Sequence, residues 1–305
     1  MSTTTYRRFR RAHALALTML ALGTSASVAR AQASDSSRLA SFLALTRLPL
    51  QHALRSADVQ RTTLTIGKRA DGTPFLVDVT RPVSSARTPL PVVLLVHGGL
   101  TDEAPIRPRS WQIYKDWGTA FAASGVAAVM FDHGLGSPQR RLDFALSEID
   151  MVLRWLAADG ARLGLATDSI GAIGFSAAGL LAPELLRDER PVRVARMALV
   201  YPLTGIASGT SAPTDDALAA RMNLGRDAIR LARRRTPLLL IRAGSDEIPG
   251  LLPLLDGNVA ALLAADACVE LLNVPGEPHS FDMLHDTPDV RAAIDRALRF
   301  VVGSG

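Results

Sequence analysis

The amino-acid sequence predicts an α/β protein with a mostly parallel sheet and helices on both faces. Beyond residue 91, short and continuously apolar runs recur along the chain, as expected for strands buried on both faces. Stretches with helical spacing of apolar residues lie between these runs, and this alternation indicates βαβ units and parallel pairing. The length of 305 residues, of which 48% are hydrophobic, suits a single domain with a large core over 61–305.

The beginning of this domain predicts an antiparallel hairpin. Residues 62–66 and 75–79 are rich in residues that favour strands, and Asp71-Gly72 between them is a turn signal. Residues 32–60, which precede the hairpin, are interpreted as a lead-in segment with a helix, because apolar residues recur there at helical spacing.

The alternating part of the chain predicts further elements in order. Strands are expected at 92–96, 126–131, 170–175, 195–200, 237–241 and 268–274, and helices at 111–123, 142–158, 180–187, 251–264 and 290–302. Residues 203–235 interrupt the alternation with more chain than a crossover helix needs. We interpret this segment as a small cap over the carboxyl ends of the strands, with an ordinary crossover carrying a long loop as the alternative.

The first 31 residues are typical of a secretory signal peptide. Four arginines lie between positions 7 and 11, a short apolar run covers 14–22, and small residues at 29, 31 and 33 fit a cleavage site. The apolar run is short for a transmembrane helix, which needs about 20 apolar residues, although an uncleaved N-terminal anchor is the alternative. We therefore expect a periplasmic or secreted protein with no stable membrane association after cleavage.

The net charge of +5 is accounted for by the five arginines of this leader, which has no acidic residue. The remaining chain is close to neutral, which argues against nucleic acid as a partner. The six histidines are scattered without metal-ligand spacing, and a single cysteine, Cys268, allows no intrachain disulfide. We expect no metal and no cofactor, and the sequence makes no prediction of oligomeric state.

The strongest motif is a serine between a predicted strand and a predicted helix, in the run Gly174-Phe175-Ser176-Ala177-Ala178-Gly179. A nucleophile elbow has this order, with small residues two positions before and after the serine so that strand and helix can pass closely. Gly174 meets this need, and Ala178 replaces the second glycine of G-x-S-x-G. An N-capped helix in any α/β protein is the alternative interpretation.

Three other motifs follow predicted strands. His97-Gly98-Gly99-Leu100 follows the strand 92–96, where glycines let backbone N–H groups turn toward a developing oxyanion. Asp246 follows the strand 237–241, with Glu247 as the fallback acid, and carboxyl ends of parallel strands are where open α/β sheets build their sites. His279 follows the last strand in a Gly- and Pro-bounded loop, with His285 as its competitor.

The order Ser176, Asp246, His279 is that of the α/β-hydrolase triad, and the four motifs together resemble the α/β-hydrolases over about 62–302. Within them the chain resembles dienelactone-hydrolase-like and esterase proteins. It departs from dienelactone hydrolases proper, which have a cysteine nucleophile, and from the esterases with three glycines after the histidine, since Leu100 stands at the third position.

The resemblance implies an exported serine hydrolase that cleaves carboxylic esters through an acyl-enzyme. Ser176 would be the nucleophile, His279 the base and Asp246 its orienting acid, with an oxyanion hole from the backbone of Ala177 and of Gly99 or Leu100. A small-molecule ester is the expected substrate, and Trp111 and His133 are candidates to line its pocket. A peptidase or amidase of the same fold, and a non-catalytic binding protein, are the alternatives.

Overall fold

The computed structural model describes residues 58–85, 88–99, 107–135, 138–206 and 216–303, with Ser37, Ala40, Ser41, Thr46 and Leu48 before them. The predicted signal peptide and most of the lead-in segment lie outside these residues.

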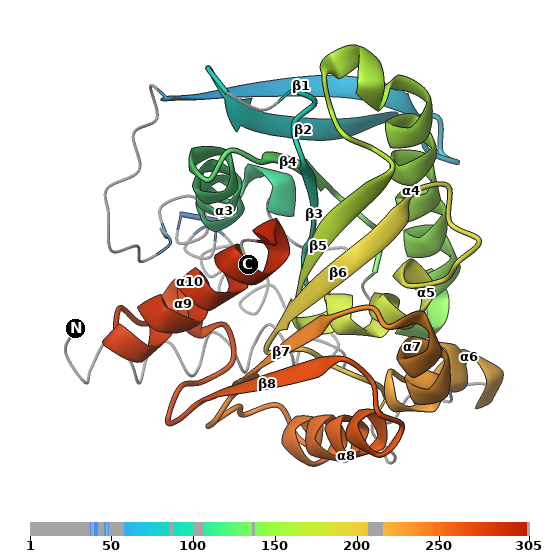
Figure 1. Cartoon of the computed structure of the whole chain (residues 1–305), viewed down its shortest axis with the longest axis vertical. Coiled ribbons are helices and arrows are strands. Elements are labelled where there is room, and N and C mark those ends of the chain that lie inside the picture. Colours follow the sequence, from blue (N-terminus) through green and yellow to red (C-terminus); the bar gives the residue numbers. More distant parts are fainter. Residues whose placement is uncertain are drawn as a thin grey trace, which may run out of the picture.

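One sheet of eight strands organises the described residues, with the order β1-β2-β4-β3-β5-β6-β7-β8 (Figure 1). The predicted hairpin is confirmed, since β1 and β2 pair antiparallel, and β2 continues antiparallel onto β4. All pairs from β4 to β8 are parallel, as the alternating pattern predicts. The strands are β1 Val59–Lys68, β2 Pro74–Pro82, β3 Val92–Val96, β4 Ala127–Phe131, β5 Ser169–Phe175, β6 Arg193–Val200, β7 Leu238–Ala243 and β8 Val269–Val274.

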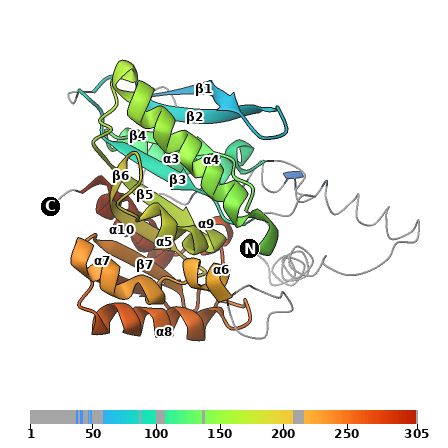
Figure 2. The same cartoon turned by 90° about the vertical axis from the view of Figure 1, so that its right-hand side faces the viewer.

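Helices cover both faces of the sheet (Figures 1 and 2). Side chains alternate between the faces of a strand. Val93 and Leu95 of β3 therefore belong to the core on the side of α3 and α10, whereas Leu94 and Val96 belong to the core on the side of α4, α5, α7 and α8. The α-helices are α3 Gln112–Ala123, α4 Pro138–Asp159, α5 Ala182–Leu185, α6 Asp216–Arg221, α7 Ala228–Arg234, α8 Leu251–Ala264, α9 Phe281–Leu284 and α10 Pro288–Val302, and short 3-10 segments are η2 Pro108–Ser110, η3 Gly160–Leu163, η4 Ser176–Leu181 and η5 Gly225–Asp227.

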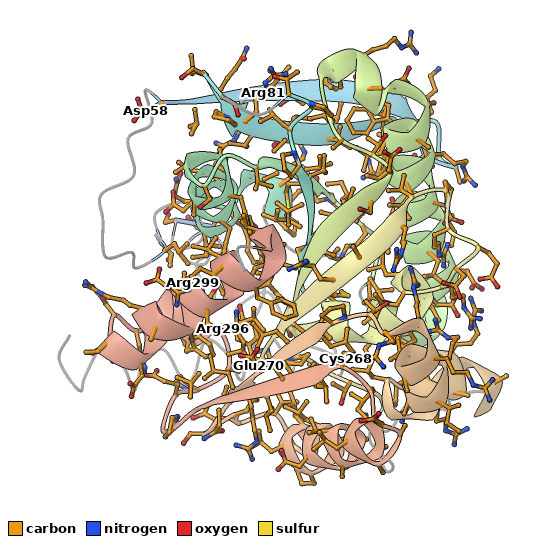
Figure 3. The ribbon with its side chains drawn as sticks, viewed as in Figure 1. Asp58, Arg81, Cys268, Glu270, Arg296 and Arg299 are labelled. Carbon is orange, nitrogen blue, oxygen red and sulfur yellow. The ribbon has the colours of Figure 1, made fainter. Side chains whose placement is uncertain are left out.

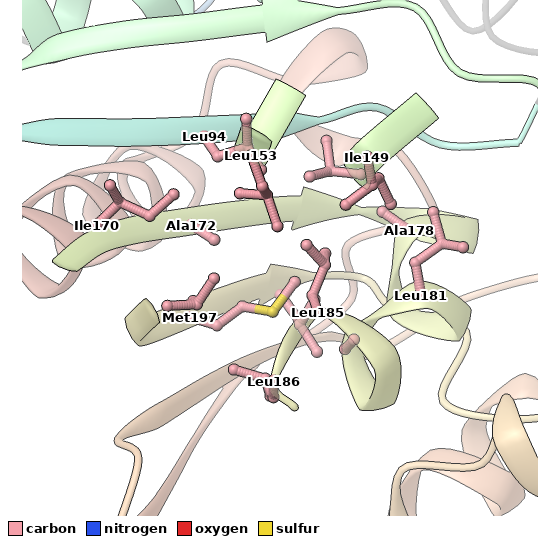
Figure 4. Packing of buried hydrophobic residues seen from close by; sticks show 14 of the residues in the cluster. Leu94, Ile149, Leu153, Ile170, Ala172, Ala178, Leu181, Leu185, Leu186 and Met197 are labelled. Atoms are coloured by element: carbon pink, nitrogen blue, oxygen red, sulfur yellow. The ribbon is translucent and has the colours of Figure 1, made fainter. Parts of the chain in front are cut away.

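The helix α4 shows how the pattern leads to packing. Its apolar residues at helical spacing, among them Ile149 and Leu153, are fully buried against β3 and β5. Figure 4 shows Leu153 above Ala172 of β5, and Ile149 near Ala178 of η4. Burying a leucine or isoleucine side chain contributes about 1.5–3 kcal/mol, so this face holds the helix onto the sheet.

The helix predicted at 180–187 is wrong in its extent. The chain forms the 3-10 segment η4 and then the single turn α5. Pro183 has no N–H to donate to a carbonyl in the preceding turn, so it marks the first turn of α5 and does not continue a helix from Ser176.

Residues 203–206 and 216–235 are the described parts of the segment for which we predict a cap. Met222, Leu224 and Leu231 are completely buried in the core, and this part of the chain forms the crossover between β6 and β7. Residues 207–215 lie outside the described residues, and the cap stays a prediction.

The last helix, α10, packs on the face opposite α4. Arg296 of α10 donates from Nε to Glu270 Oε1 of the edge strand β8 at 2.8 Å (Figure 3). Thr287 caps the start of the helix by accepting from the backbone N–H of Val290 at 3.2 Å. In the part of the chain that the structure describes, no helix is both long and apolar enough to span a membrane.

Candidate active site

Ser176 lies on the sharp turn between β5 and η4, and its backbone φ of 51° is in the left-handed region. A residue with a Cβ adopts this conformation at a cost of about 1–2 kcal/mol, and such strain persists only where the surroundings enforce it. One enforcing contact is the hydrogen bond from the backbone N–H of Leu203 to the carbonyl of Ser176 at 3.0 Å.

Small residues around this turn are required by close contacts. A Cβ on Gly174 would lie 3.0 Å from a side-chain carbon of Leu199 and 3.1 Å from the Cβ of Ala178, and a Cβ on Gly179 would lie 2.3 Å from the carbonyl oxygen of Leu203. Ala178 itself is fully buried. The second glycine of this turn is therefore needed at 179, and the methyl group at 178 is accommodated.

Hydrogen bonds join the three residues that the sequence singles out in order (Ser176, Asp246 and His279). Nε2 of His279 lies 2.8 Å from Ser176 Oγ, and Nδ1 lies 2.6 Å from Asp246 Oδ2. The Asp246 side chain is completely buried and that of His279 is 11% exposed. A carboxylate on Nδ1 fixes the tautomer that leaves Nε2 free to accept the serine proton.

The alternatives for these positions do not enter this arrangement. Glu247 is exposed, whereas Oδ1 of Asp246 accepts from the backbone N–H of Ile248 at 3.0 Å, which fixes the carboxylate. His285 contacts the carboxylate of Glu277 through Nδ1.

Glu277 ties the loop of Asp246 to the loop of His279. Its carbonyl accepts from the backbone N–H of Ser245 at 2.9 Å, and its buried carboxylate accepts from Thr287 Oγ1 at 2.9 Å. The loops after β7 and β8 are thus fixed to each other and to the start of α10.

Gly98 lies directly against Ser176. A Cβ at Gly98 would be 3.1 Å from the serine Cβ and 3.7 Å from its Oγ, so glycine allows the loop after β3 to approach the hydroxyl group. Gly99 is exposed beside it, and Ala177, the next residue after the serine, is partly exposed. Leu100 lies outside the described residues.

His97 and His133 form a buried stacked pair beneath this loop, with ring centroids 3.6 Å apart. The backbone N–H of His133 donates to His97 Nε2 at 3.0 Å, and that of Leu135 donates to His133 Nδ1 at 3.2 Å. The other nitrogen of each ring faces a carbonyl, that of Gly98 for His97 and that of His97 for His133. This pattern requires two neutral rings.

Burial enforces the neutral state of this pair. It lowers the pKa of His97 to about 3, and burial together with the neighbouring His97 lowers the pKa of His133 well below its ordinary value. Both ring nitrogens of His133 bond to backbone groups, and its place in a substrate pocket stays a prediction.

Trp111 is the partly exposed member of an aromatic group on α3 and just before it. Its ring stacks on Tyr114 at 5.7 Å between centroids, and the hydroxyl of Tyr114 lies 3.4 Å from the backbone nitrogen of Gly98. Trp117 is completely buried, as expected for a core position.

Sequence reasoning missed a buried polar group near His279. Asp282, three residues later, is 1% exposed, and its carboxylate accepts from Tyr201 and Trp117. In the sequence Asp282 resembles any loop acid, and only its place between Phe281 and Met283 in an apolar stretch hints at burial.

Solved structures resemble the chain over most of its length. A bacterial heroin esterase has a TM-score of 0.66 at 20% identity, with 96% of each chain covered. A thermostable esterase from Pseudomonas putida has a TM-score of 0.65 at 20% identity, with 90% of this chain and 91% of the other covered. Carboxyl esterase 2 from the fungus Tuber melanosporum has a TM-score of 0.63 at 20% identity, with 88% of this chain and 96% of the other covered. The chain has the α/β-hydrolase fold. No protein-family model and no curated protein matches its sequence.

The α/β-hydrolase fold brings the ends of β3, β5, β7 and β8 together, and each contributes one segment of the site. The geometry permits a proton to pass from Ser176 Oγ to His279 Nε2 while Asp246 stabilises the charge on the ring. Among the described residues, no group of three or more His, Cys, Asp or Glu side chains is arranged to hold a metal ion.

Proposed function

We propose that this protein is a serine hydrolase that cleaves carboxylic esters of small molecules. The observation that carries the proposal is the continuous chain of hydrogen bonds from Ser176 Oγ through His279 to Asp246. The fold neighbours named above are esterases, which supports the same reaction class, although a fold alone does not decide function.

The first half of the proposed reaction forms an acyl-enzyme. Ser176 Oγ attacks the ester carbonyl while His279 Nε2 takes its proton, which gives a tetrahedral oxyanion. The intermediate then collapses, the bond to the alkoxy oxygen breaks, and the imidazolium returns the proton to the leaving alcohol. Asp246 holds the ring and stabilises its positive charge.

The second half releases the acid. A water molecule gives a proton to His279 Nε2 and attacks the acyl carbon, and the second tetrahedral intermediate expels Ser176 Oγ, which regains the proton. Backbone N–H groups of Ala177 and of Gly99 or Leu100 would bind the oxyanion in both halves, and loss of one such donor typically costs about 3 kcal/mol.

Two further residues near the site receive roles in this proposal. We assign His133 to the support of the glycine loop, since its ring stacks on His97 and its polar atoms face the backbone. Trp111 is the candidate for a substrate contact, because it is partly exposed and stacks on Tyr114, which lies beside Gly98.

The first test compares hydrolysis of nitrophenyl acetate, butyrate and octanoate by the protein and by its Ser176→Ala variant. We expect turnover that falls by at least about 10³-fold in the variant, because the nucleophile is lost. Equal turnover in both proteins would exclude Ser176 as the nucleophile. Absence of both turnover and fluorophosphonate labelling in folded protein would favour a binding protein.

We further infer that the hydrolase acts in the periplasm or outside the cell, because residues 1–31 have the three regions of a signal peptide. The mass of the protein recovered from the exported fraction tests cleavage near residue 31, and an intact leader there would favour the anchor.

A further inference from the structure

Asp282 is a second buried carboxylate beside His279, and the proposed reaction does not use it. Both of its oxygens accept hydrogen bonds, Oδ1 from the Tyr201 hydroxyl at 2.7 Å and Oδ2 from Trp117 Nε1 at 3.1 Å. The donors come from the end of β6 and from α3, so the carboxylate joins three separate segments. A buried polar network with all partners satisfied fixes one arrangement of its members.

The charge of this carboxylate is not cancelled by its donors, because a phenol and an indole are both neutral. Burial raises the pKa of Asp282, while the two hydrogen bonds and the proximity of His279 act in the opposite direction. Both oxygens accept and neither faces an acceptor in these two bonds, which is the pattern of an ionised carboxylate.

Tyr201 connects Asp282 to the reacting imidazole. Its ring lies edge-on to the ring of His279, with centroids 4.7 Å apart, and edge-on to Phe281 at 5.4 Å. The backbone φ of Tyr201 is 41°, so the residue is held in a conformation that few side chains adopt. Its hydroxyl bond to Asp282 fixes the plane of the ring that supports His279.

We propose that Asp282 is a positioning residue of the hydrolase: it fixes His279 through Tyr201, and its charge favours the imidazolium that forms when Ser176 attacks. This inference rests on the proposed function, since it concerns the same reaction. Asp246 acts on the imidazole through Nδ1, and Asp282 acts on it through the packed ring of Tyr201.

The groups that face this pair are few among the described residues. His279 contacts Ser176, Asp246 and the ring of Tyr201, and Asp282 interacts with Tyr201, Trp117 and His279. Tyr114 adds a phenol whose pKa is raised by its burial and by Asp282, so it stays neutral at working pH. Asp246 thus bonds to the imidazole directly, and Asp282 is a second carboxylate that interacts with it.

The experiment measures the rate of fluorophosphonate labelling of Ser176 and the kcat and KM for nitrophenyl butyrate between pH 5 and 9. Asp282→Asn removes the charge and nearly conserves the shape of the side chain. Tyr201→Phe keeps the ring and removes the hydroxyl that donates to Asp282. Asp116→Asn is the matched control, because Asp116 is a buried aspartate of α3 that accepts from Leu48 N and Gln112 Nε2. Unfolding curves of each variant give the folded fraction.

For Asp282→Asn we expect labelling and kcat to fall about tenfold, KM to stay within about twofold, and the acid limb of the profile to move about half a pH unit lower. The direction follows from the sign, since loss of a nearby negative charge makes the imidazolium less favourable. Tyr201→Phe should lower both rates by about threefold without moving the acid limb, and Asp116→Asn should change neither.

The inference is overturned if the Asp282→Asn variant is labelled as fast as the unchanged protein and its pH profile has the same acid limb. It is also overturned if the decrease in labelling and kcat equals the fraction of the variant that is unfolded. Should this variant not fold, unchanged kcat in Tyr201→Phe overturns it equally. Failure of the proposed function is distinct, because the unchanged protein would then neither label at Ser176 nor turn over esters.

Discussion

The conformation of Ser176 shows how one residue depends on its small neighbours. The serine has a positive φ, which brings the following turn against Leu203, and the backbone there leaves no space for a Cβ on Gly179. The methyl group of Ala178, in contrast, points into the core beside Leu181 (Figure 4). The sequence departs from G-x-S-x-G only in which of two adjacent residues has no side chain.

A pair of exchanges tests this conclusion. Gly179→Ala should lower the free energy of unfolding by about 1–3 kcal/mol and reduce ester turnover, because its Cβ must displace backbone. Ala178→Gly, which restores the motif, should cost about 1–2 kcal/mol through a lost buried methyl group and added chain entropy, with little change in kcat. Urea unfolding and nitrophenyl butyrate hydrolysis measure both, and a Gly179→Ala protein as stable as its parent would contradict the steric argument.

Which residues could be predicted depended on whether a local pattern marked them. Ser176, Asp246 and His279 each follow an apolar run that ends in small or polar residues, and the ends of parallel strands meet at one edge. Asp282 and Tyr201 carry no such mark, since their role comes from contacts between segments that lie far apart in the sequence. Burial of Asp282 against Trp117 joins residues 165 positions apart.

At the scale of elements, α10 and the loops after β7 and β8 form one connected unit. Thr287 takes part twice: its hydroxyl accepts from Val290 N at the start of α10 and donates to Glu277, whose carbonyl in turn fixes the Asp246 loop through Ser245. A change at the helix end should therefore reach the loops of the site.

Thr287→Val should lower the free energy of unfolding by about 1–2 kcal/mol, because it removes a helix cap and a donor to a buried carboxylate. Thr287→Ser keeps the hydroxyl and should retain most of this stability, which makes it the control. Thermal unfolding of the three proteins measures the effect, and a loss in Thr287→Ser as large as that in Thr287→Val would contradict the role given to the hydroxyl group.

The elements themselves were largely predictable. Buried strands such as 92–96 are continuously apolar, because a strand in the middle of such a sheet is covered by helices on both faces. The helix predicted at 180–187 does not form in full, because Pro183 and the tight turn after Ser176 outweigh the helical spacing of the leucines. Pro183 and the turn act through backbone hydrogen bonds, which the spacing of apolar residues does not reveal.

For the whole molecule, the stacked pair of His97 and His133 makes stability depend on pH. The folded state holds His97 neutral, with its pKa lowered from 6.5 to about 3, whereas the unfolded chain takes up a proton near pH 6.5. The contribution of neutral His97 to the free energy of unfolding is therefore complete above pH 6.5 and is lost as pH falls toward about 3. The loss is about 1.4 kcal/mol per pH unit for each such histidine. Glu148 and Asp282, whose pKa values burial raises, act in the opposite direction.

We expect urea unfolding at pH 7, 6, 5 and 4 to show stability that declines steadily below pH 6.5. His97→Asn keeps one donor and one acceptor but cannot titrate, so its decline should be less steep by up to about 1.4 kcal/mol per pH unit. Parallel declines in the two proteins would show that other groups control the acid response.

The bond between His279 and Ser176 joins residues 103 positions apart in the chain, and the strands that carry them are separated in the sheet by β6 and β7. Contacts between residues so far apart in the chain form only after the entropy cost of closing the intervening loop has been offset by other contacts. Helical signals in a refolding chain can return from local segments alone. The proposed hydrolysis, in contrast, requires the complete sheet from β5 to β8, so the return of ester turnover would report the assembly of these four strands.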